Sequence, residues 1–175
     1  MSQEPGMGVN YIYFNMENGP TADIKVRKAL QMAVDRDAMC AALYQYGECS
    51  PAYLPLPPAS WGYDESLEDL VPKYDVEGAK KLLAEAGYPE GFELEYYTSD
   101  SASSKKIGEI LQQFCAKVNV KVNIHQASWG TFSEIGASGN ADAIGMSWTW
   151  FPDPYFYLNK MFHEESLGTL GNGQQ

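Results

Sequence analysis

Residues 22–39, with the sequence ADIKVRKALQMAVDRDAM, decide the fold class of this chain. Their apolar residues recur at the spacing i, i+3, i+4, i+7 and i+8, which places them on one face of an α-helix: Val26, Ala29, Leu30, Ala33 and Val34. An apolar face of this kind needs a surface to cover. We therefore expect Val26, Leu30 and Val34 to be buried against a sheet.

Strand and helix patterns alternate along the rest of the chain. Asp23 and Asp35 are each placed to cap a helical segment, so we expect the first helix to bend or restart near Asp35. Further helices are predicted at residues 75–86, 105–117, 131–137 and 155–162, and strands at residues 9–14, 92–97, 118–125 and 141–146. The Pro-rich residues 47–74 are expected to form a long ordered loop. This alternation predicts an α/β layered domain with a mixed sheet.

Composition and charge exclude several function classes. Hydrophobic residues make up 45% of the chain and charged residues 20%, which is typical of a folded globular protein. The net charge is −11 and the 12 basic residues are scattered, so we expect no nucleic acid as a partner. No apolar run approaches the roughly 18 residues that a membrane span needs.

The cysteine and histidine residues give no sign of a metal site. The two histidines, His125 and His163, lack a spacing that would bring ligands together, so we predict no metal and no cofactor. Cys40 and Cys115 lie in helical patterns and are interpreted as small buried residues, while a disulfide of Cys49 stays open. No catalytic motif is present, and we predict no catalytic residue.

The order of several motifs resembles a known family. The pattern V-R-x-A-x-x-x-A-x-D-R at residues 26–36 follows YIYFN at 11–15 and precedes PLPPASWGYD at 55–64. Next come YDxExAKxLLAEAGY at residues 74–88, Trp129 at the start of a helix, and WTWFPDP at 148–154. These motifs resemble the bacterial extracellular solute-binding proteins of family 5, which serve peptide, nickel and related ABC importers.

The resemblance implies a fold, a location and partners. The fold would be an α/β, periplasmic-binding-protein-like (type II) lobe, with a mixed sheet flanked by helices. Residues 9–175 would form the C-terminal lobe of a two-lobe protein, and we exclude residues 1–8 as disordered or cloning-derived. The lobe would bind a peptide or another small solute against the missing first lobe and pass it to ABC permease transmembrane subunits. The full-length chain would be a lipoprotein at the extracellular face of the membrane or in the periplasm.

The candidate ligand-binding residues follow two predicted strands. In α/β folds the ligand crevice lies beyond the carboxyl ends of strands, and Trp148, Trp150 and Phe151 follow the strand at 141–146. Trp129 follows the strand at 118–125, and we expect it on the same side of the lobe. The alternative is that these aromatics fill the lobe's own core or contact the missing lobe. Asp153 completes the candidate set, although capping the next helix is its favoured role.

Two departures from the family bear on the ligand. Members that grip both ends of a peptide resemble one another in placing Arg three residues before the loop tryptophan and Asp three residues after it. The corresponding positions here are Gly145 and Phe151. A buried charged terminus without a counter-charge is costly, so a zwitterionic peptide held in that way is disfavoured. The competing hypothesis is a hydrolase-like α/β enzyme domain completed by a missing partner segment.

Overall fold

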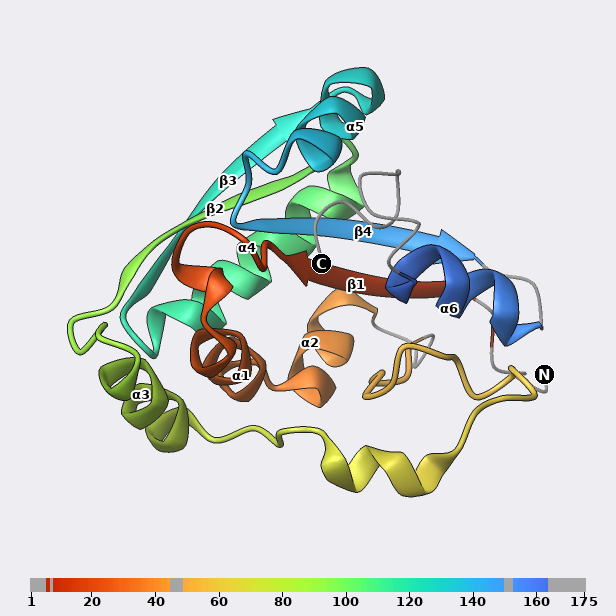
Figure 1. The fold of residues 1–175 in the computed structure, drawn as a ribbon, viewed down its shortest axis with the longest axis horizontal. Helices are drawn as coiled ribbons and strands as arrows, with labels where there is room; N and C mark the ends of the chain where they lie inside the picture. The colour runs from red at the N-terminus through yellow and green to blue at the C-terminus, as the bar shows by residue number, and fades with distance from the viewer. Residues whose placement is uncertain (1–5, 7, 45–48, 150–152, 164–175) are drawn as a thin grey trace.

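A computed structural model of the protein describes residues 6, 8–44, 49–149 and 153–163 (Figure 1). It contains strands β1 (Gly8–Phe14), β2 (Phe92–Ser99), β3 (Val120–Ala127) and β4 (Ala143–Thr149). Its α-helices are α1 (Ile24–Ala33), α2 (Arg36–Leu43), α3 (Val76–Glu85), α4 (Ala102–Ala116), α5 (Trp129–Ser138) and α6 (Pro154–Phe162). Two 3-10 helices, η1 (Pro20–Ala22) and η2 (Glu65–Leu70), complete the set.

The four strands form one mixed sheet in the order β1-β4-β2-β3. β2 pairs in parallel with β3 and with β4, whereas β1 pairs antiparallel with β4. The α/β fold class with a mixed sheet is therefore confirmed. β1 begins at Gly8, one residue inside the range that the sequence analysis excluded.

The break in the first helix is confirmed at the predicted place. Asp23 accepts a hydrogen bond from the backbone N–H of Lys25, and Asp35 accepts one from that of Ala38, so α1 and α2 each have a side-chain cap. Val34 departs from the prediction because it lies just after α1 in an extended conformation, which leaves it only partly buried.

α1 packs beside α3, and Figure 1 shows the two helices next to each other. Val26 and Leu30 are buried as expected, in a core cluster that also contains Leu94 of the sheet. Both residues belong to the main core, which joins α1, α3 and α4 to one face of the sheet.

The two faces of the sheet carry different clusters. Alternate residues of a strand point to opposite faces, so Tyr96 of β2 enters the main core while its neighbour Tyr97 contacts a second cluster. The second cluster contains Phe132 of α5, Ala141 and Ile144. α4 therefore covers one face, and α5 covers part of the other.

Several element boundaries differ from the prediction for local reasons. β3 starts at Val120 rather than 118 because Asn119 has a φ of 62°, outside the range of a strand. α4 starts earlier than predicted because Ser101 caps it by accepting from the N–H of Ser104. The expected loop 47–74 contains η2.

The prediction that Cys40 and Cys115 are small buried residues holds for Cys115 only. Cys115 is buried, and burial raises the pKa of its thiol to about 12. Cys40, in contrast, is bonded to Cys49 in a disulfide and is only partly buried. The helical pattern around Cys40 could not reveal this partner. Among the helices of the described residues, none is long and apolar enough to cross a membrane.

Candidate ligand-binding face

Two of the predicted tryptophans lie toward the carboxyl ends of parallel strands. β3 and β4 both run parallel to β2, so their carboxyl ends point in the same direction along the sheet. Trp129 opens α5 directly after β3, and Trp148 lies near the end of β4. Figure 1 shows α5 following the end of β3 and α6 following the end of β4. The Trp129 side chain is 56% exposed, with its ring 5.8 Å from that of Phe132.

Trp148 does not lie on a loop, contrary to the prediction. β4 extends to Thr149, and Trp148 pairs with Val9 of β1 in the antiparallel ladder. Antiparallel pairing with the first strand of the chain extends β4, and no local pattern predicts that partner. Trp150 and Phe151, also predicted as site residues, lie outside the described residues.

Asp153 has the capping role that the sequence analysis favoured. Its Oδ1 accepts a hydrogen bond from the Tyr155 N–H at 2.9 Å, and Pro154 occupies the first turn of α6. An oxygen engaged with the helix N-terminus in this way is already satisfied by a backbone donor. Asp153 is therefore the N-cap of α6.

β1 adds residues to this face that sequence reasoning missed. Tyr11 and Tyr13 pair with Met146 and Ile144, so their side chains share the face of Trp148. The two tyrosine rings lie 5.3 Å apart, and the Tyr13 hydroxyl is 2.9 Å from the Met146 sulfur. The alternation of Tyr11 and Tyr13 was a visible signal, but only the pairing with β4 connects it to Trp148.

The phenols of this face are neutral at physiological pH. Burial raises the pKa of Tyr13 to about 12 and that of Tyr157, on α6, to about 12. Burial raises the pKa of Tyr11 further, and its phenol neighbours add to the effect. The face therefore presents aromatic rings, a thioether and neutral hydroxyl donors, which suit the uncharged parts of a ligand.

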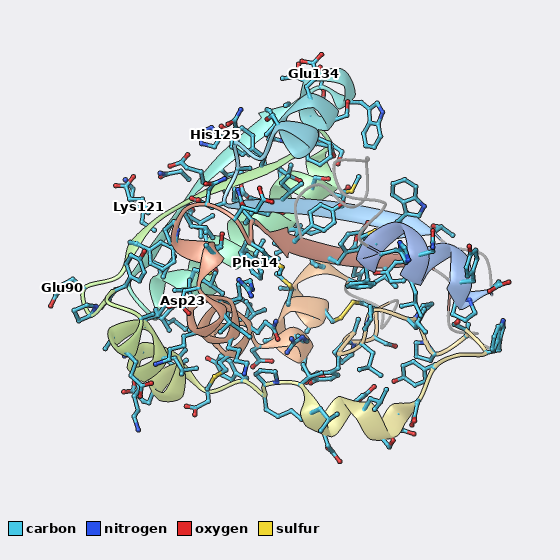
Figure 2. The ribbon with its side chains drawn as sticks, in the orientation of Figure 1. Phe14, Asp23, Glu90, Lys121, His125 and Glu134 are labelled. Carbon is cyan, nitrogen blue, oxygen red and sulfur yellow. A yellow bond between two sulfur atoms is a disulfide. The ribbon has the colours of Figure 1, made fainter. Side chains whose placement is uncertain are left out.

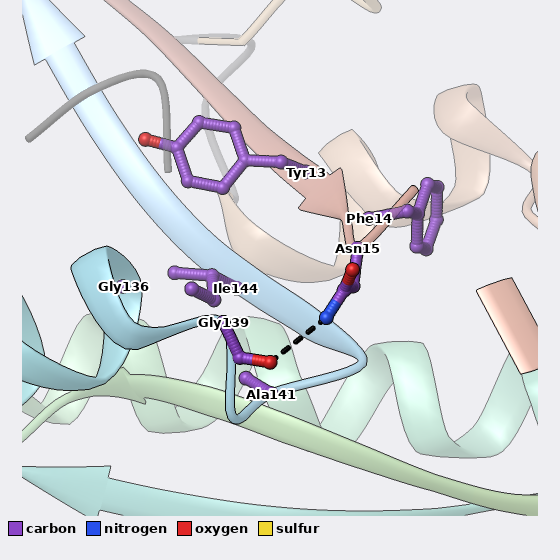
Figure 3. A pocket seen from close by; sticks show the side chains of 7 residues that line it. All are labelled: Tyr13, Phe14, Asn15, Gly136, Gly139, Ala141 and Ile144. Carbon is purple, nitrogen blue, oxygen red and sulfur yellow. Dashed lines mark hydrogen bonds between the residues drawn. The ribbon is translucent and has the colours of Figure 1, made fainter. Parts of the chain in front are cut away.

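A small cavity beside this face is too small for a solute. It holds about 10 Å³, roughly the space of one water molecule. Figure 3 shows its lining residues, which are Tyr13, Phe14, Asn15, Gly136, Gly139, Ala141 and Ile144. The Asn15 side-chain amide donates to the Gly139 carbonyl at 2.9 Å and closes one side. This cavity is therefore not a candidate solute site.

Polar side chains of β2 and β3 pair across the two strands in a short ladder. Lys121 pairs with Glu93, and His125 pairs with Glu95. Within the part of the chain that the structure describes, no group of three His, Cys, Asp or Glu residues could hold a metal. His125 bonds to Glu95, stacks on Tyr97 with ring centroids 4.5 Å apart, and projects outward with Lys121 in Figure 2. The His125 side chain is 42% exposed.

Comparisons with known proteins agree with this architecture. The sequence profile of "Bacterial extracellular solute-binding proteins, family 5 Middle" matches residues 1–168. Heme-binding protein A of Haemophilus influenzae is 35% identical over 172 residues, covering 95% of this chain and 31% of the relative. The dipeptide-binding protein of Escherichia coli is 34% identical over 164 residues, covering 89% of this chain and 30% of the relative.

Solved structures share the fold over almost the whole chain. HbpA2 from Haemophilus parasuis has a TM-score of 0.88 at 30% identity, covering 98% of this chain and 35% of its own. A dipeptide-binding protein from Pseudoalteromonas, in complex with Met-Leu, has a TM-score of 0.83 at 29% identity, covering 98% and 36%.

The chain spans about a third of the length of these relatives. The relatives are substrate-binding proteins rather than enzymes, so the hydrolase-like alternative has no support. With a family match over residues 1–168 and the same fold, the chain belongs to the bacterial extracellular solute-binding proteins of family 5.

Proposed function

We propose that this chain is one lobe of the substrate-binding component of an ABC importer. The lobe binds one side of a peptide or another small solute at the carboxyl edge of β3 and β4. The observation that carries this proposal is that Trp129 directly follows β3 and Trp148 lies near the end of β4, two strands that both run parallel to β2, in a chain of this family. Trp150, Phe151 and Asp153, next along the chain, complete the proposed site.

A second lobe completes the site in this proposal. Residues 9–175 correspond to the C-terminal lobe, and the first lobe supplies the opposite wall of the cleft. A solute held between two walls buries most of its surface, whereas a single wall leaves one side in water. The relatives' greater length supports this proposal, because this chain covers only 31% of Heme-binding protein A.

The chemistry of the face favours contacts with uncharged parts of the ligand. Tyr11, Tyr13 and Met146 offer rings, neutral hydroxyls and a thioether beside Trp148. Positions 145 and 151 carry Gly and Phe, so this lobe does not offer a charged pair there for both peptide termini. A peptide would then be held here by its side chains and backbone, and its termini would need groups elsewhere.

The disulfide supports an extracellular or periplasmic location. The bond between Cys40 and Cys49 is of the kind that persists in oxidising compartments. We propose that the full-length protein is a lipoprotein anchored outside the cell membrane and delivers its solute to ABC permease transmembrane subunits. The description of the family as extracellular solute-binding proteins supports a location outside the cell membrane.

Calorimetry on the full-length protein tests the site. The probes are the dipeptide Met-Leu, which is bound in a similar solved structure, and haem, after which a similar protein is named. Truncating Trp129 or Trp148 to Ala should weaken binding about tenfold or more, as expected for a buried aromatic contact. The control is Tyr74→Ala, an exposed aromatic packed on α4 and not at this edge. Unchanged affinity in both tryptophan variants would refute the assignment of the site.

An enzyme assay addresses the competing class directly. The full-length protein is incubated with broad ester and peptide substrates, and product is followed over time. We expect no turnover above background. Turnover that a single substitution between Trp129 and Asp153 abolishes would establish an enzyme instead of a binding protein.

A further inference from the structure

Strand β4 leaves β2 before its own end and continues as half of a two-stranded arm. Among the described residues, the last pair between the two strands is Tyr97 with Ile144. β4 then runs on with β1 as its paired neighbour. We call residues 8–11 and 146–149 the arm, and Figure 1 shows this end of β1 and β4 directed away from β2 and β3. Trp148 of the proposed site belongs to the arm.

The ring of Tyr96 lies where the two strands separate. Tyr96 is fully buried and belongs to the main core on one face of the sheet. Gly145 directly follows the last pair of β2 with β4. A Cβ atom added at Gly145 would meet the hydroxyl, Cζ and Cε2 of the Tyr96 ring, with Cε2 at 3.0 Å. The ring therefore rests on the backbone of β4 just before the arm begins.

The opposite edge of the same ring rests on helix α4. A Cβ atom added at Gly108 of α4 would lie 3.1 Å from Cε1 of Tyr96, which is tighter than ordinary contact. The Tyr96 hydroxyl also has a side-chain hydrogen bond with Thr98, which is 1% exposed. A ring packed this closely has little room to move, and a close-packed interior transmits a displacement from one neighbour to the next. Two glycines, Gly108 on α4 and Gly145 on β4, thus lie against the two edges of one ring.

We propose that Tyr96 is a positioning residue for solute binding, because its ring fixes the direction in which the arm leaves the sheet. β2 no longer pairs with β4 beyond this point, and the contact with Gly145 ties the start of the arm to the main core. A tilt of the arm would move Trp148 together with Tyr11 and Met146 beside it. Binding groups contribute fully only when their supports hold them in place. This inference rests on the proposed function, because it assumes that Trp148 contacts the solute.

Two variants of the full-length protein disturb the ring without changing a residue of the arm. Tyr96→Leu removes the part of the ring that lies on Gly145. Gly108→Ala adds a methyl group against the opposite edge of the ring, from a helix that contributes no residue to the proposed site. Alanine favours a helix more than glycine does, which offsets the cost of the closer contact. The matched control is Leu94→Ala, because Leu94 is buried in the same core on the same strand, two residues before Tyr96.

Hydrogen exchange tests the hold on the arm without any ligand. Exchange of the backbone amides of residues 146–149 should speed up about tenfold in Tyr96→Leu and about threefold in Gly108→Ala, because the arm opens more easily when the ring is removed or displaced. Leu94→Ala lowers the global stability and should leave this local opening unchanged. Unchanged exchange of these amides in both ring variants would overturn the inference. If Tyr96→Leu fails to fold, Gly108→Ala decides alone.

Calorimetry with Met-Leu, measured well below the melting temperature, separates positioning from stabilisation. A positioning role raises the dissociation constant about tenfold in Tyr96→Leu and about threefold in Gly108→Ala, and leaves it unchanged in Leu94→Ala. A purely structural role would lower the melting temperature of Tyr96→Leu and leave its dissociation constant unchanged. Unchanged affinity in both ring variants would overturn the inference, as would an equal loss of affinity in Leu94→Ala. If the wild-type protein binds neither Met-Leu nor haem, the proposed ligand class fails, and exchange in the arm decides the positioning claim.

Discussion

The phenol of Tyr96 occupies the space that a side chain at Gly145 would need. Tyr96 is fully buried in the main core, and a Cβ at position 145 would meet its Oη and Cζ closer than non-bonded atoms approach. Tyr96 of β2 pairs with Ala143 of β4, two residues before Gly145, and the end of its ring lies over Gly145 on the same face of the sheet. The absence of a side chain at position 145 is therefore a packing requirement of this core.

Replacing Gly145 with Ala should destabilise the protein by about 1–3 kcal/mol, the usual cost of overpacking a core. Tyr96 is fully buried in the main core, so a displaced ring would disturb its neighbours there. The free energy of unfolding from a denaturant titration measures the loss. Gly130→Ala is the matched control because a Cβ there meets nothing within 4 Å. A neutral Gly145→Ala would mean that β2 and β4 separate easily.

Replacing Leu30 with Ala should cost about 2–5 kcal/mol, the range for a large-to-small change in a core. Leu30 is 3% exposed and lies on the face of α1 that packs against α3. Ile24→Ala on the same helix is the control, because Ile24 is 56% exposed and should lose less than about 0.5 kcal/mol. Equal losses at the two positions, measured by urea denaturation, would contradict the placement of α1.

Glu95 should make stability depend on pH in the acid range. Hydrogen bonds from Asn123 and His125 lower the pKa of its carboxyl below the ordinary value of 4.5. A carboxyl with a lowered folded pKa contributes stability above its unfolded pKa and loses that contribution as pH falls through the folded pKa. The side chain is 41% exposed, so solvent screens this contribution.

The check on Glu95 is a set of unfolding curves from pH 7 down to pH 3. Glu95→Gln should flatten the decline of the unfolding free energy below about pH 4.5. Glu90→Gln, which removes a carboxylate from the loop before β2, controls for the change in net charge. The same acid decline in the wild type and in Glu95→Gln would show that the ladder does not contribute.

The isolated lobe should fold but bind solute much more weakly than the full-length protein. Its described residues form one main core, which joins helices α1, α3 and α4 to the sheet, so folding does not require the second lobe. Affinity for a small ligand depends on burying most of its surface, which one wall cannot do. Calorimetry with the same ligand on both proteins measures the difference. Equal affinities would place the whole site within this chain and end the two-lobe proposal.

Local patterns in the sequence determined the helices and several of their ends. Asp23, Asp35 and Asp75 each cap a helix through their own carboxylate, and Gly87 ends the third predicted helix with a φ of 93°. These features depend on residues within a few positions of one another, so periodicity and capping rules suffice to predict them. The inward side of β2, with Leu94 and Tyr96, followed from alternation for the same reason.

Only the tertiary structure decided how distant segments meet. It paired Trp148 with Val9, joined Cys40 to Cys49, seated Gly62 on Pro154, and brought Tyr96 against Gly145. Strand order and core contacts depend on which surfaces bury the most apolar area together, and that choice involves residues far apart in the chain. The sequence could therefore predict that the candidate face is aromatic. Only the pairing of β1 with β4 shows which residues form it, with Tyr11 and Tyr13 beside Met146 and Trp148.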